Sequence, residues 1–68
     1  MTEHVSIEAR VSTSDPWVHW KSIPAWVLDD KISLRLQRDH VRELVREDEG
    51  RDARVALRIV NENGKVVG

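Results

Sequence analysis

Acid–base chemistry in this 68-residue sequence would depend on very few side chains. Asp29 and Asp30 are adjacent carboxylates, and a pair of this kind can act as general acid and general base. His19 lies between two tryptophans and could serve as a base there. Adjacent acids in a loop are more often solvent-exposed turn residues than catalytic groups. A single histidine is more often a structural residue, at the surface or in the interior. We therefore predict no catalytic residue and a protein that is not an enzyme.

Metal and cofactor sites are not indicated either. The sequence has no cysteine, which excludes thiolate ligands and disulfides. The histidines are far apart, unlike the short paired spacings of common zinc sites; they are His4, His19 and His40. The three glycines form neither a phosphate-binding loop nor a nucleophile motif. We predict no metal and no cofactor.

All the aromatic surface of the sequence lies in one short segment. Trp17, Trp20 and Trp26 fall within ten residues, while Phe and Tyr are absent. Each indole can remove about 150–250 Å² from water, so the rings either cover the open face of a small sheet or anchor a partner. Trp is enriched at interface hot spots, and at least one ring is expected to stay exposed. The predicted partner-binding residues are Trp17, His19, Trp20 and Trp26.

A second segment supports an alternative function. Residues 31–37 alternate apolar and polar side chains, which predicts a strand. Asp39 then caps a short predicted helix that reaches Glu49 and stops at Gly50. In the strand Ile32, Leu34 and Leu36 would face inward.

Residues 31–51 resemble the start of ribbon-helix-helix repressors, in which the strands of two subunits pair and read base edges in the major groove. The resemblance implies a dimeric DNA-binding regulator that uses the strand Lys31–Gln37. Its outward side chains would be the base readers, since Arg and Gln suit guanine and adenine. The implied DNA-binding residues are Ser33, Arg35 and Gln37 at bases and Arg38 and Arg42 at phosphates.

The other patterns predict one small α+β domain over residues 1–68, with one short helix on a mainly antiparallel sheet. His4–Ser12 alternates as a strand, and residues 13–30 form a turn and an irregular Trp-rich loop. Arg54–Val60 alternates too, although a helix is the competing interpretation for it. Asn63-Gly64 then predicts a two-residue hairpin in which Glu62 faces Lys65. The expected order is β-β-α-β-β.

Charge and hydropathy limit the partners. The net charge is −1, with −3 in residues 1–30 and +2 in residues 31–58, which is weak for a committed nucleic-acid binder. The longest apolar run is residues 25–28, too short to span a membrane, and no signal peptide is visible. We expect a cytoplasmic protein-interaction or assembly module of accessory, regulatory or phage type. Its partner would be another protein or, as a homo-oligomer, a second copy, and DNA is the second candidate.

Overall fold

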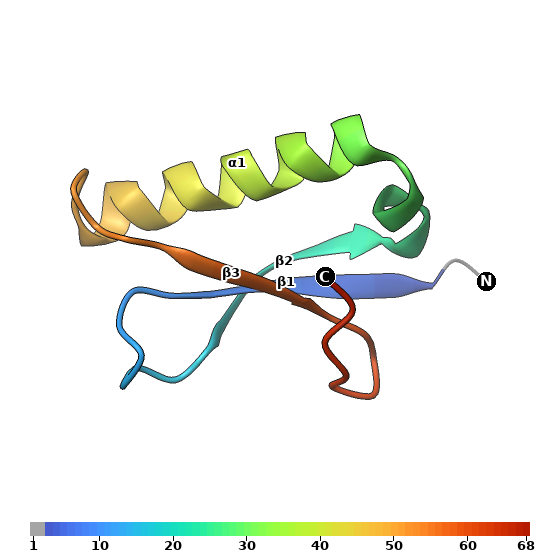
Figure 1. The fold of residues 1–68 in the computed structure, drawn as a ribbon, viewed down its shortest axis with the longest axis horizontal. Coiled ribbons are helices and arrows are strands. Elements are labelled where there is room, and N and C mark those ends of the chain that lie inside the picture. Colours follow the sequence, from blue (N-terminus) through green and yellow to red (C-terminus); the bar gives the residue numbers. More distant parts are fainter. Residues whose placement is uncertain (1–2) are drawn as a thin grey trace.

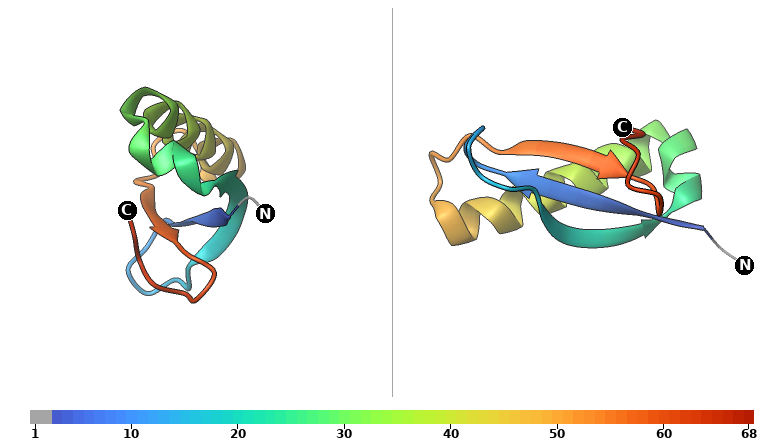
Figure 2. Two further views of the ribbon diagram at one scale, coloured as in Figure 1. Left: turned by 90° about the vertical axis from the view of Figure 1, so that its right-hand side faces the viewer. Right: turned by 90° about the horizontal axis from the view of Figure 1, so that it is seen from below.

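The computed structural model describes residues 3–68 as a helix packed on a small sheet (Figure 1). The elements are β1 (His4–Arg10), β2 (Val18–Pro24), the 3₁₀ helix η1 (Ala25–Asp29), α1 (Lys31–Glu49) and β3 (Ala56–Val60). The strand order is β2-β1-β3, and both pairs are antiparallel. Figure 2 shows that α1 covers one face of this sheet. The predicted α+β class, with one helix on an antiparallel sheet, is confirmed.

The central strand β1 follows from the alternation of its side chains. Val5, Ile7 and Ala9 are buried against α1, while the residues between them face the open side of the sheet. Burial of one face fixes the register, because a slip of one residue would turn the whole apolar set outward. The rest of the core is contributed by η1, α1 and the two outer strands: Ile23, Val27, Val41, Val45 and Ile59.

The prediction of a strand at Lys31–Gln37 was wrong, because these residues are the first two turns of α1. Asp30 is the N-cap: its carboxylate accepts hydrogen bonds from the backbone N–H groups of Ile32 (3.1 Å) and Ser33 (3.2 Å). The predicted cap, Asp39, lies in the middle of the helix. The apparent alternation is misleading, since only Leu34 packs against the core while the apolar residues on either side of it point to solvent.

The Trp-rich segment was predicted to be irregular, but part of it forms the second strand, β2. The two-residue alternation is hidden by a β-bulge. Ile7 is paired with Lys21 whereas Glu8 is paired with His19, so Trp20 is an extra residue in the register. Pro24 ends the strand, and η1 follows directly.

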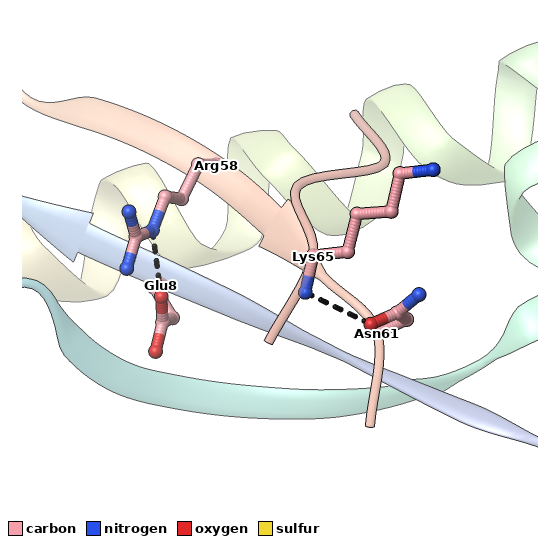
Figure 3. Close-up of polar contacts among 4 residues, drawn as sticks. All are labelled: Glu8, Arg58, Asn61 and Lys65. Carbon is pink, nitrogen blue, oxygen red and sulfur yellow. Dashed lines mark hydrogen bonds and ion pairs between the residues drawn. The ribbon is translucent and has the colours of Figure 1, made fainter. Parts of the chain in front are cut away.

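The C-terminal region confirms a strand at β3 and rules out the competing helix. The turn after it differs from the predicted two-residue hairpin. Asn61 O accepts from Gly64 N, and Asn61 N donates to Lys65 O, both at 2.9 Å, so the loop contains residues 62–64. The Asn61 side chain also accepts from Lys65 N at 2.9 Å (Figure 3), and Gly64 takes φ +82°. Beyond the turn Val66 bridges to Val60, and Ile59 donates to Gly68 O and accepts from Val67 N, both at 2.8 Å, so the predicted fourth strand is reduced to this short contact with β3.

The cap at Asp30 gives a pH-dependent contribution to stability. The backbone N–H of Ser33 donates to the carboxylate and lowers its pKa from the usual value. A depressed pKa stabilises the fold above the unfolded-state pKa, and this contribution is lost as the pH falls through the folded-state value. We expect Asp30→Ala to lower the melting temperature at neutral pH. We expect Asp30→Asn, which keeps a capping oxygen, to lose less stability than the wild type between about pH 5 and about pH 2.

The control is Asp29→Asn, which removes the same charge one residue earlier without touching the cap. Its melting temperature should keep the acid dependence of the wild type. Unfolding is monitored by circular dichroism at 222 nm. If the melting temperatures of Asp30→Asn and the wild type fall equally with pH, Asp30 is not the titrating cap.

Candidate functional site

The four predicted partner-binding residues differ in how far they are buried. Trp17 is half-buried, and His19 is exposed in β2. Trp20 is half-buried and packs against the core. Trp26, in η1, is the one indole that stays largely exposed, which confirms that at least one ring remains open to solvent. The tryptophans therefore divide between structure and surface.

Trp17 is occupied by the protein's own arginines. The guanidinium carbons of Arg10 and Arg58 lie 4.4 Å and 4.5 Å from the centre of the indole ring. Arg58 Nε also donates to Glu8 Oε1 at 2.7 Å (Figure 3). Glu8 is paired in the register with both His19 and Arg58, so the cluster spans all three strands. The two cations occupy part of the π surface of Trp17, which leaves less of it for stacking on a ligand.

The most exposed large apolar side chains lie around the junction of η1 and α1. Ile32 is 76% exposed, Leu36 63% and Trp26 58%. Ile32 and Leu36 are one turn apart, and at about 100° per residue they lie on the side of α1 opposite the buried Val41 and Val45. We call Trp26, Ile32 and Leu36 the apolar surface. Each of these three residues is more than half exposed.

A row of cations runs along an adjacent side of the same helix. Its members share the spacing i, i+4, i+7, i+11 and border an open groove of about 460 Å³ together with Leu34 and Asp39: Lys31, Arg35, Arg38 and Arg42. We call these four residues the basic row. Arg42 is the member of the basic row that forms an ion pair: its Nη1 donates to Asp39 at 3.1 Å. Within the described residues, the other three cations of the row form none. The groove therefore keeps a charge of +3.

The predicted DNA-binding residues are only partly brought together. Arg35, Arg38 and Arg42 share the basic row, but on a helix and not on a strand. At helical spacing Ser33 and Gln37 fall on a different side of α1, and Gln37 Oε1 is buried without a hydrogen-bond partner. The premise of a base-reading strand is thus wrong, while three of its arginines form a cationic surface.

The acid–base pair that Asp29 and Asp30 could have formed is not present. Asp30 is committed to capping α1, so Asp29 and Asp30 do not form a free carboxylate pair. Residues 3–68 contain no group of three or more His, Asp and Glu side chains placed to hold a metal ion. In the same range, no helix combines the length and the apolar character that crossing a membrane requires.

Sequence reasoning missed the apolar surface because it placed Ile32 and Leu36 inside a strand. The sequence feature that could have revealed the helix was its N-cap, Asp30. Asp30 is followed by 19 residues without Gly or Pro, and within them Leu34, Val41 and Val45 repeat at spacings of seven and four. In a helix whose buried side carries these three residues, Ile32 and Leu36 lie outside the buried side.

Comparison with known proteins does not add a family to this description. No protein-family model matches the chain, and no curated protein and no solved structure shows significant similarity to it.

Proposed function

We propose that the protein is a non-enzymatic interaction module that binds a segment of another protein through its apolar surface. The supporting observation is the exposure of Trp26, Ile32 and Leu36 on one short stretch of chain. Complete burial of an aliphatic side chain of this size is worth about 1.5–3 kcal/mol, and Trp is the residue most enriched among interface hot spots. A chain without cysteine needs no oxidising compartment, so we propose that the module works in the cytoplasm.

The charge beside the apolar surface favours a different protein over a second copy of this chain. Two copies that paired antiparallel through Ile32 and Leu36 would be related by a two-fold axis, and each surface would meet itself. Lys31 and Arg35 of one copy would then approach the same residues of the other. Like charges brought together in this way oppose association, whereas a foreign segment need not carry them.

The proposal is tested with a library of random 16-residue peptides displayed on phage. We expect peptides selected on the wild-type protein to bind at least about tenfold more weakly to the variant Trp26→Ser/Ile32→Gln/Leu36→Gln, because truncation of hot-spot residues typically costs 1–2 kcal/mol or more. Binding is measured by fluorescence anisotropy of labelled peptides. The three positions are exposed, so circular dichroism should show an unchanged fold.

The matched control is Val18→Thr/Val66→Thr, which removes exposed apolar surface elsewhere in the molecule. It should bind the selected peptides like the wild type. Equal binding to the triple variant and the wild type would contradict the proposal. Sedimentation equilibrium provides a second test: if the wild type is a dimer and the triple variant a monomer, the surface is occupied by a second copy and the foreign partner is wrong.

A further inference from the structure

We infer that the partner segment is acidic and that its carboxylates lie in the groove along the basic row. This inference rests on the proposed function and specifies the partner's chemistry. Ile32 and Leu36 of the apolar surface lie on a side of the first turns of α1 that is adjacent to the basic row, at about 100° from it. A segment with apolar residues beside Asp or Glu residues would contact both at once.

The first reason is that these cations oppose the stability of their own helix. The positive end of the helix dipole is at the N-terminus, where acidic side chains are favoured. The first turn of α1 contains no acid and begins with Lys31; the acids at this end are Asp29 and the N-cap Asp30, whose carboxylate is already bound to the backbone N–H groups of Ile32 and Ser33. The last two turns carry four acids and one cation, Arg46; the acids are Glu43, Glu47, Asp48 and Glu49. Charges placed against a local stability rule are expected at functional sites, and here the missing counter-charge would come from a ligand.

The second reason is the state of the groove itself. Within residues 3–68, Lys31, Arg35 and Arg38 have no carboxylate partner. Arg38 is only partly exposed, and its Nε is buried without a hydrogen-bond partner. Its Nη2 lies near the C-terminal segment, since a Cβ atom at Gly68 would be 3.7 Å away. The Arg38 guanidinium is therefore partly enclosed, and its planar N–H groups can bind a carboxylate through two parallel hydrogen bonds.

An acidic protein segment fits this surface better than a nucleic acid. Asp39 lies in the groove beside the cations. A phosphate backbone that continued along α1 beyond Arg42 would leave the positive surface and meet a region of mixed charge, with Glu43 and Glu47 beside Arg46 and Arg51. The sequence pI of about 6.3 is also far from that of a typical nucleic-acid-binding domain. A short acidic segment can end before that region.

The test uses three peptide pools on the full chain. All share apolar residues at i, i+3, i+4 and i+7 and differ only at the flanking positions, which are Asp/Glu, Asn/Gln or Lys. We expect binders almost only from the acidic pool. We expect their affinity to fall at least about tenfold for Arg35→Gln/Arg38→Gln and to weaken steeply as salt rises above about 150 mM. Binding is again measured by fluorescence anisotropy.

The matched control, Arg51→Gln/Arg54→Gln, removes the same charge from two exposed arginines outside the groove. It should lose less than about twofold, as expected for screened charges. Equal recovery from the neutral pool, or equal loss in the two double variants, would overturn the inference while leaving the proposed function in place. No binders from any pool would overturn both. Tighter binding of a mixed-sequence 20-base-pair duplex than of the acidic peptides would make the row a nucleic-acid site and overturn the inference as well.

Discussion

Replacement of Ile7 by Ala is expected to lower the free energy of unfolding by about 3–4 kcal/mol, a large part of the stability of so small a domain. Ile7 is fully buried in the central strand and is paired in the register with Ile59, which is also fully buried. The strand cannot move inward to fill the gap, because it is hydrogen-bonded on both sides. A cavity would remain, and its cost adds to the lost burial.

The chain offers a chemically identical control for this substitution. Ile32→Ala removes the same atoms from a position that is mostly exposed, and it should change the free energy of unfolding by less than about 0.5 kcal/mol. Ile7→Val should fall between the two, at about 1 kcal/mol. Urea unfolding followed by tryptophan fluorescence gives all three values. Similar losses for Ile7→Ala and Ile32→Ala would show that the core is not built around β1.

The parts of the fold that the sequence predicted correctly are those with an undisturbed local pattern. β1 alternates without interruption, and β3 does so over a shorter length, so both could be recognised. β2 could not, because the bulge at Trp20 breaks its period of two. The class of the fold was therefore predictable, while the identity of the second strand depended on pairing with β1.

The candidate site was less predictable than the fold for a related reason. Ile32, Leu34 and Leu36 satisfy a strand pattern over the seven residues 31–37, and only the longer repeat from Leu34 to Val41 and Val45 shows that they belong to a helix. The residues next to an apolar residue in the sequence do not show whether it lies on the buried or on the exposed side of a helix. For the same reason the sequence could name the arginines of the basic row but not place them on one side of one helix.

The second large effect tests that helix directly. Leu36→Pro is expected to lower the free energy of unfolding by about 3 kcal/mol or more. Residue 36 is in the interior of α1, where proline removes the hydrogen bond to the carbonyl of residue 32 and clashes with it. The side chain contributes little of this loss, since it is mostly exposed.

Leu36→Ala separates the effect of proline on the backbone from the effect of losing the leucine side chain. Alanine is the strongest helix former, so this variant should match or slightly exceed the wild type in stability. Both variants remove the exposed leucine side chain, so a difference in stability between them reports the backbone effect of proline. Had residues 31–37 been an edge strand, proline at a position facing solvent would have been tolerated far better. A difference of less than about 1 kcal/mol between Leu36→Pro and Leu36→Ala would therefore contradict the helix, and with it the apolar surface and the basic row that depend on its spacing.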